Sequence, residues 1–195
     1  MITKKRIGLF GGSFDPPHLG HLLVAESARE QLGLEQVIFV PAFQPPHKNG
    51  LQQCTAAQRL KMTHLAVRNN RRFKVSAIEI RRKGVSFTID TVMQFKKQFP
   101  EAELFFIMGG DSINQFTRWK SPAEILALTQ IAVYHRAGER KRKTIFKRKI
   151  HFLSGGLVTI SSSEIRRKIH RSESIRYLVP ENVYQYIQSH NLYTP

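Results

Sequence analysis

Residues 11–22, which read GGSFDPPHLGHL, constrain this chain more than any other feature. They follow a short basic and apolar run over 5–10 that is typical of a buried strand, and they precede apolar residues at helical spacing over 22–32. The segment is therefore predicted to connect a first strand to a first helix. A glycine loop at such a junction leaves backbone N–H groups free, and the positive end of the helix dipole points into the same space. We expect a phosphate site there.

Two histidines strengthen this expectation. His18 and His21 are three residues apart, so at the start of a helix they lie on one face and both can reach a phosphate above its N-terminus. A lone helical histidine more often has an ordinary surface or core role, but a pair that follows a glycine loop and Asp15-Pro16-Pro17 favours phosphate chemistry. Two other phosphate motifs are absent: G-x-x-x-x-G-K-S/T, and G-x-G-x-x-G with an acid closing the second strand.

The rest of the chain alternates between strand and helix patterns. Further strands are expected at 37–40, 73–80, 103–108 and 131–134, and two later segments, 150–153 and 157–160, are also strand-like. Periodicity predicts helices over 87–99 and 181–190. Three more helices are expected after capping boxes that begin at Thr55, Ser121 and Ser161, the second with Pro122 at its first helical position.

This alternation predicts the fold class: an α/β protein with a Rossmann-like doubly wound parallel sheet. We expect one domain over 1–195, with a small C-terminal helical lobe at about 161–195. Ligands of such folds lie beyond the carboxyl ends of the strands. Because all the unusual motifs fall at those ends, they are predicted to form one shared site.

Two signatures resemble those of a known family. The pattern G-x-F-D-P-x-H-x-G-H, which starts at Gly12, is similar to the signature of the nucleotidyltransferase superfamily that uses an H-x-G-H pair. The segment ISSSEIR at 160–166 is similar to the ISST-x-I-R of the same family, with Ser163 in place of the usual Thr. That departure keeps the hydroxyl and loses only a methyl group.

Three further segments narrow the resemblance to the bacterial nicotinate-nucleotide adenylyltransferases. They are PAFQPPHK at 41–48, the Gly109-Gly110-Asp111 turn, and Trp119-Lys120. The matches run in order along nearly the whole chain. The resemblance implies transfer of the adenylyl group of ATP to nicotinate mononucleotide, giving nicotinate adenine dinucleotide and pyrophosphate, in NAD biosynthesis.

Such a transfer needs no general base, because the attacking phosphate is ionised at neutral pH, so catalysis rests on positioning and charge stabilisation. We expect His18, His21 and Arg166 to be catalytic: the histidines stabilise the leaving pyrophosphate, and Arg166 grips the β and γ phosphates. The resemblance implies that His18 is closer to the α-phosphate. The other expected ATP- and phosphate-binding residues lie in three turns: Gly11, Gly12, Ser13, Phe14, Gly109, Asp111, Ser162 and Ser163. Mg²⁺ is expected on the phosphates, largely through water, and no metal site built by the protein is predicted.

The resemblance also implies a site for the mononucleotide. Trp119, the only tryptophan, would stack on the pyridine ring, although the residue alone would favour a core role. The backbone near Thr88 and Lys120 would donate to the nicotinate carboxylate. Lys48 would reach the phosphate of the mononucleotide from a Pro-rich loop that is a candidate lid.

The roles of three other residues stay open. Asp111 follows two glycines after a strand, a position that suits either a hydrogen bond to a ribose or a turn that caps a helix at Ser112. Glu79 and Arg136 match positions of the family, but the sequence assigns neither a role.

Charge is the other unusual global property. The formal net charge is +17, and the stretch 136–149 holds eight basic residues against one acid. This favours a solvated basic face over a nucleic-acid footprint, and no RNA-binding aromatic signature accompanies it. Cys54 is the only cysteine, so no internal disulfide is possible. Neither a membrane span nor a signal peptide is expected, so we expect a cytoplasmic location without a membrane partner.

Two alternative functions explain less of the sequence. A sister enzyme acting on nicotinamide mononucleotide, phosphopantetheine or a polyol phosphate gives no reason for the segment 45–48 or for Trp119-Lys120. A basic nucleic-acid-binding protein would account for the charge but for neither phosphate motif. The sequence leaves open whether the chain forms a homo-oligomer, what its ratio of preference for acid over amide is, and what the basic stretch does.

Overall fold

The computed structural model describes residues 4–46, 53–134, 149–155 and 159–194. Within these residues six parallel strands form one sheet in the order β3-β2-β1-β4-β5-β6. They are β1 (Arg6–Gly12), β2 (Gln36–Pro41), β3 (Phe73–Val75), β4 (Glu103–Gly109), β5 (Gln130–Tyr134) and β6 (Ile150–Leu153). The order reverses beside β1, where the chain returns from the β3 edge to begin β4. The predicted Rossmann-like doubly wound sheet is confirmed.

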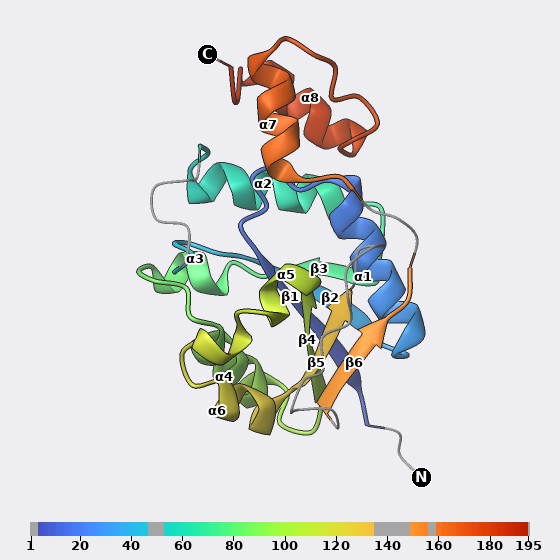
Figure 1. The fold of residues 1–195 in the computed structure, drawn as a ribbon, viewed down its shortest axis with the longest axis vertical. Helices are drawn as coiled ribbons and strands as arrows, with labels where there is room; N and C mark the ends of the chain where they lie inside the picture. Colours follow the sequence, from blue (N-terminus) through green and yellow to red (C-terminus); the bar gives the residue numbers. More distant parts are fainter. Residues whose placement is uncertain (1–3, 47–52, 135–148, 156–158, 195) are drawn as a thin grey trace.

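Helices cover both faces of this sheet (Figure 1). In the described residues they are α1 (Leu19–Gln31), α2 (Ala56–Val67), α3 (Ile78–Arg82), α4 (Thr88–Gln98), α5 (Gly110–Ile113), the 3-10 helix η1 (Phe116–Arg118), α6 (Pro122–Leu128), α7 (Ser162–His170) and α8 (Glu181–Ser189). One hydrophobic core packs α1, α2, α7 and α8 against one face, and a second packs α4 and α6 against the other. Because both faces are buried, the strands are nearly continuous apolar runs.

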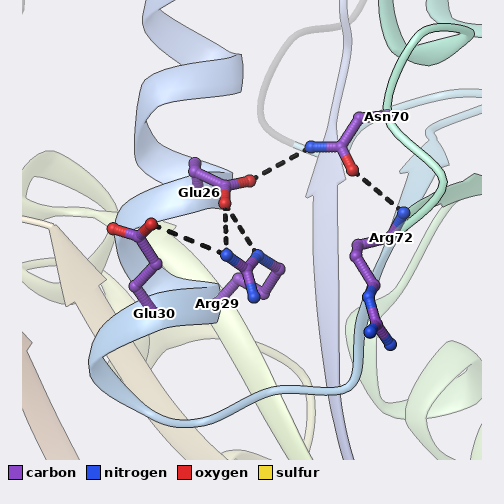
Figure 2. Close-up of polar contacts among 5 residues, drawn as sticks. All are labelled: Glu26, Arg29, Glu30, Asn70 and Arg72. Carbon is purple, nitrogen blue, oxygen red and sulfur yellow. Dashed lines mark hydrogen bonds and ion pairs between the residues drawn. The ribbon is translucent and has the colours of Figure 1, made fainter.

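A small polar network holds α1 beside the turn that leads into β3 (Figure 2). The Glu26 carboxylate accepts hydrogen bonds from Arg29 Nε at 2.8 Å and from Asn70 Nδ2 at 3.1 Å. The Asn70 side chain in turn accepts from the backbone N–H of Arg72 at 2.9 Å. These contacts help to fix α1 on the sheet, and with it the histidines at its N-terminal end.

Two of the three predicted capping arrangements are present. Thr55 Oγ1 accepts from the Gln58 N–H at 3.2 Å while the Gln58 side chain accepts from the Thr55 N–H at 2.9 Å, and Ser161 accepts from the Glu164 N–H at 3.2 Å. The predicted box at Ser121 is wrong. Its φ of 50° is left-handed, whereas a capping serine needs extended backbone to reach the N–H groups of the first turn. Pro122 does occupy the first position of α6, as predicted.

The third predicted strand is too long. The alternating pattern over 73–80 ends as strand at Val75, and Ile78–Arg82 forms α3. The reason is tertiary, because the buried Glu79 carboxylate accepts a hydrogen bond from Thr91 of α4. The predicted strand at 157–160 lies partly outside the described residues, and residues 159–160 are not strand.

The helices α7 and α8 lie together beyond α2, at the end of the molecule toward which the strands run (Figure 1). Their connection is joined to the start of α1, because the Leu19 N–H donates to the Leu178 carbonyl at 3.0 Å. None of the helices in the described part of the chain combines the length and apolar character that crossing a bilayer requires.

Candidate active site

Two adjoining cavities lie beyond the carboxyl ends of β1 and β4, where the strand order reverses. The first has a volume of about 380 Å³ and is lined by the glycine segment together with the starts of α1 and α7. The second has a volume of about 270 Å³ and is lined by Pro45, Pro46, the start of α4 and Trp119. Residues 11–13 and Gly109 line both, so the two cavities are parts of one site.

The glycines of this segment are closely packed against aromatic rings. A Cβ at Gly12 would lie 3.0 Å from the ring of Phe14, and one at Gly11 would lie 3.2 Å from the ring of Phe106. Phe14 has a left-handed φ of 49°, and its ring is buried in the first core, 5.7 Å from Phe10 between centroids. A ligand in the first cavity therefore meets mainly the backbone of this segment.

The structure brings the two histidines together. His18 is the N-cap of α1 and only 5% exposed, and its ring centroid lies 3.7 Å from that of His21. The backbone N–H of His18 donates to His21 Nδ1 at 3.1 Å, and the His21 ring packs on the edge of Phe14. Both histidines line the first cavity.

The start of α7 faces the same cavity. Ser161, Ser162, Ser163 and Arg166 all line it. Ser162 Oγ donates to the Pro16 carbonyl at 2.9 Å, and Arg166 Nη1 donates to the Asp15 carbonyl at 2.7 Å. The N-termini of α1 and α7 thus converge on one cavity that also contains a guanidinium group. Helix dipoles and a fixed cation in this arrangement attract a polyanion.

The second cavity has an aromatic wall. Trp119 is half-buried, with its ring nearly perpendicular to that of Phe106 at 6.0 Å and inclined to that of Phe116 at 5.5 Å. It therefore both packs on the second core and lines the cavity. Thr88 is the first residue of α4, so the free N–H groups of that helix begin at this cavity. The ammonium group of Lys120 lies 3.5 Å from Asp90 and 4.6 Å from the ring centroid of Phe87.

A buried carboxyl group also lines the second cavity. Thr91 Oγ1 donates to Glu79 Oε1 at 2.5 Å, and Ser86 bonds to the same carboxylate. Burial raises the pKa of Glu79, and these hydrogen bonds oppose that shift. Ser86 also accepts from the Phe43 N–H at 2.9 Å and donates its own N–H to the Gln44 carbonyl at 2.9 Å. Glu79 thereby anchors the segment 84–88 against the loop at 43–46.

Arg59 is a site-forming residue that the sequence did not reveal. It is 1% exposed, and its guanidinium donates to the carbonyls of Ser13 at 2.7 Å and Phe43 at 3.0 Å. A third bond reaches the Cys54 carbonyl at 3.3 Å. The Arg59 guanidinium thus connects the glycine segment, at Ser13, with the Pro-rich loop, at Phe43. In the sequence it is one of many arginines on an amphipathic helix, and no local pattern marks it as buried.

Several predicted site residues lie outside the residues that the structure describes, and one lies inside a helix and not at its cap. Lys48, Arg136 and the basic stretch up to residue 148 lie outside the described residues. Asp111 is the second residue of α5, and the cap position that the sequence left open to it is occupied by Gly109. No group of three or more His, Cys, Asp or Glu side chains within the described ranges could hold a metal ion.

A larger hollow, of about 1090 Å³, lies at the opposite edge of the sheet, where the strands begin. Most of its cations bind groups of the chain itself. Lys5 pairs with Glu35 at 2.8 Å, Arg6 pairs with Glu103 at 2.8 Å, and Lys149 donates to the Leu126 carbonyl at 2.6 Å. The pair of cavities at the carboxyl ends is therefore the better candidate for the active site.

The chain is similar in sequence to curated nicotinate-nucleotide adenylyltransferases. It is 40% identical over 191 residues to a probable enzyme of this name from Salinibacter ruber, an alignment that covers 97% of this chain and 98% of the relative. It is 43% identical over 188 residues to another from Exiguobacterium sibiricum, with 96% and 98% covered.

The fold is similar to that of a Plasmodium falciparum nicotinic acid mononucleotide adenylyltransferase complexed with NaAD, with a TM-score of 0.81, 20% identity and 97% of both chains covered. The model of the cytidylyltransferase-like family matches residues 9–168. Given this match and relatives of 40% and 43% identity over nearly the full length, the chain belongs to the cytidylyltransferase-like family and, within it, to the nicotinate-nucleotide adenylyltransferases.

Proposed function

We propose that this chain transfers the adenylyl group of ATP to nicotinate mononucleotide and so makes nicotinate adenine dinucleotide for NAD biosynthesis, as its curated relatives are named to do. One structural observation supports this reaction above others. A polyanion cavity and an aromatic cavity share the wall formed by residues 11–13. Two nucleotides can therefore meet there, with their phosphates against the glycine segment and the pyridine against Trp119.

The chemical step is a displacement at phosphorus. An oxygen of the mononucleotide phosphate attacks the α-phosphorus of ATP, and the bond from that phosphorus to the oxygen bridging to the β-phosphate breaks. The electron pair leaves with pyrophosphate. Since the attacking phosphate is already ionised, no proton has to be removed, and the barrier falls through positioning and charge stabilisation.

We assign the first cavity to the triphosphate. The backbone N–H groups of residues 11–14 and the N-terminus of α7 bind phosphate oxygens, and Ser162, Ser163 and Gly109 complete the wall. His18 and His21 donate to the phosphates where negative charge develops as pyrophosphate leaves. Arg166 has a fork of N–H donors, and those not used on the Asp15 carbonyl or the Ser163 hydroxyl grip the β and γ phosphates. Asp111 binds a ribose hydroxyl.

We assign the second cavity to the acceptor. The pyridine ring stacks on Trp119, and the nicotinate carboxylate binds the free N–H groups near Thr88 at the N-terminus of α4. The Lys120 ammonium already pairs with Asp90, so the backbone of Lys120, not its side chain, is the donor on that side. Lys48 binds the phosphate of the mononucleotide.

ATP-dependent enzymes of this family use a divalent cation, and we propose Mg²⁺. It enters on the triphosphate as part of the substrate. This fits the donor chemistry of the site, because the residues described by the structure contain no cluster of three carboxylate, imidazole or thiol groups that could form a cage.

The proposal is tested by incubating the pure chain with ATP, Mg²⁺ and, in parallel reactions, nicotinate mononucleotide, nicotinamide mononucleotide and phosphopantetheine. We expect pyrophosphate and a dinucleotide product chiefly from nicotinate mononucleotide. Product from phosphopantetheine, with none from a pyridine mononucleotide, would refute the assignment of the acceptor.

A further inference from the structure

A hydrogen bond connects the C-terminal end of the described chain to the loop between β1 and α1. The Tyr193 hydroxyl donates to Asp15 Oδ1 at 2.7 Å, across a sequence separation of 178 residues. Both partners are buried, Tyr193 at 6% exposure and Asp15 at 2%. Tyr193 lies outside the signatures of the sequence and lines neither cavity of the site.

The end of α8 aims Tyr193 at the loop. Asn191 has a left-handed φ of 47°, and its N–H donates to the Gln188 carbonyl at 3.3 Å while the Leu192 N–H donates to the Ile187 carbonyl at 3.0 Å. These two bonds form a Schellman motif with asparagine at its left-handed position. Leu192 and Ile187 are both buried in the first core, which completes the motif. The reversal returns the chain toward the start of α1.

Both carboxylate oxygens of Asp15 and its backbone carbonyl accept hydrogen bonds. Its second carboxylate oxygen accepts from the Gln53 N–H at 2.9 Å, and its carbonyl accepts from Arg166 at 2.7 Å. The buried Arg59 guanidinium attracts the same carboxylate. Asp15 is therefore the point where the glycine segment, α7 and the end of the chain meet, three residues before His18.

We propose that Tyr193 is a positioning residue for adenylyl transfer, and that it acts through Asp15 on the placement of His18. The inference rests on the proposed function for its kinetic test. Without the hydroxyl, the buried Asp15 carboxylate loses one of the hydrogen bonds that hold it, and the loop before His18 is fixed less firmly. A small displacement of a catalytic group lowers the rate of the chemical step more than it lowers substrate affinity.

The test is Tyr193→Phe, which keeps the ring in the core and removes only the hydroxyl. We expect kcat to fall about tenfold or more while the KM for ATP changes less than about twofold. Tyr184→Phe is the matched control, because the Tyr184 ring of α8 is likewise partly buried against the first core but lies 4.7 Å from the Arg176 guanidinium and has no contact with Asp15 among those that the structure describes. It should leave kcat unchanged. Asp15→Ala, which removes the acceptor of that bond, should lower kcat at least as much, and adding Tyr193→Phe to it should lower kcat no further, since the bond is already absent.

A second readout does not depend on turnover. In a histidine-selective NMR spectrum, Tyr193→Phe should shift the ring resonances of His18 and His21, identified by His18→Ala and His21→Ala, and Tyr184→Phe should not. Unshifted histidine resonances, or a kcat within twofold of wild type in folded Tyr193→Phe, would overturn the positioning role. If wild-type protein makes no dinucleotide, the proposed function fails, and the resonances alone decide the role of Tyr193.

Discussion

The backbone N–H of His18 donates to Nδ1 of His21, and the two rings lie against each other at the entrance of α1. A ring nitrogen that accepts a hydrogen bond carries no hydrogen, so this bond selects the His21 tautomer that has its hydrogen on Nε2. Nε2 is then the donor for the phosphate contact that we propose for His21, and the His18 ring lies against its neighbour. The pair is built as a unit, so its two members should not contribute independently.

His18→Ala should lower kcat about a hundredfold or more and change the KM for ATP much less, because the charge that it meets grows in the transition state. The double variant His18→Ala/His21→Ala should be less impaired than the product of the two single effects. Steady-state kinetics with pyrophosphate detection measures both. Near-normal turnover by folded His18→Ala would remove this residue from the catalytic group.

Arg166→Lys should remain impaired. A lysine keeps the charge, but its single ammonium cannot bind the Asp15 carbonyl and a phosphate with a planar fork of donors. Loss of one charged hydrogen bond corresponds to a decrease in kcat/KM of about 10- to 100-fold. Arg167→Lys is the matched control, since Arg167 pairs with Glu164 on the exposed side of α7. Equal kinetics in the two variants would argue against a phosphate role for Arg166.

Trp119→Ala should raise the KM for the mononucleotide about tenfold or more and leave that for ATP nearly unchanged, because only the pyridine stacks on the ring. Wild type should strongly prefer nicotinate over nicotinamide mononucleotide. The amide points an NH₂ group at N–H donors and leaves them unpaired, at about 1–3 kcal/mol for each buried group. The measurement is kcat/KM for both acceptors in both proteins. A variant that loses ATP affinity instead would place this ring at the adenine.

Glu79 predicts a pH dependence of stability. Because burial raises its pKa in the folded state, folding favours the protonated carboxyl. This contribution is fully present below the pKa of the unfolded chain, about 4.3, and is lost as pH rises through the folded pKa. The Glu79→Gln variant does not show this loss of stability, because an amide does not ionise. Its free energy of unfolding relative to wild type should therefore increase from pH 4 to pH 7, as measured by urea denaturation. The exposed Glu101→Gln should show no such trend.

Cys54 should be unreactive in the folded protein. Burial raises the pKa of its thiol to about 11, so almost no thiolate is present at neutral pH. Alkylation by iodoacetamide at pH 7.5 should be slow in buffer and rapid in urea, with mass spectrometry as the measurement. Fast modification of the native chain would mean that the contact region between Tyr193 and Asp15 opens readily.

The sheet and most of its boundaries could be predicted because buried strands and capped helices have local signatures. Ile38 and Val40 lie in one core while Phe39 lies in the other, a consequence of simple alternation. Predictions failed where contacts between distant segments decide. The hydrogen bond from Thr91 to Glu79 accompanies the end of β3, and the left-handed backbone of Ser121 leaves this N-cap of α6 without a side-chain capping bond.

The candidate site divides in the same way. Its glycine, histidine and serine segments are continuous motifs. In contrast, Arg59 of α2 contacts Ser13, and Tyr193, which follows α8, contacts Asp15. Their importance depends on acceptors that are far away in sequence, and nothing beside them in the chain reveals it. The Trp119 ring packs on the second core and also lines the second cavity, so its stacking on a pyridine stays a prediction.

The bonds from Ser162 to Pro16 and from Arg166 to Asp15 span 146 and 151 residues. During synthesis, the glycine segment and the start of α1 are made long before α7. Until α7 emerges and docks, a nascent chain holds its glycine segment without the opposing helix, so the triphosphate site that we propose is incomplete. We therefore expect ATP affinity to arise late in synthesis, with contacts of high sequence separation, which generally form slowly. ATP should protect the finished protein from proteolysis while leaving released fragments that end before residue 161 unprotected.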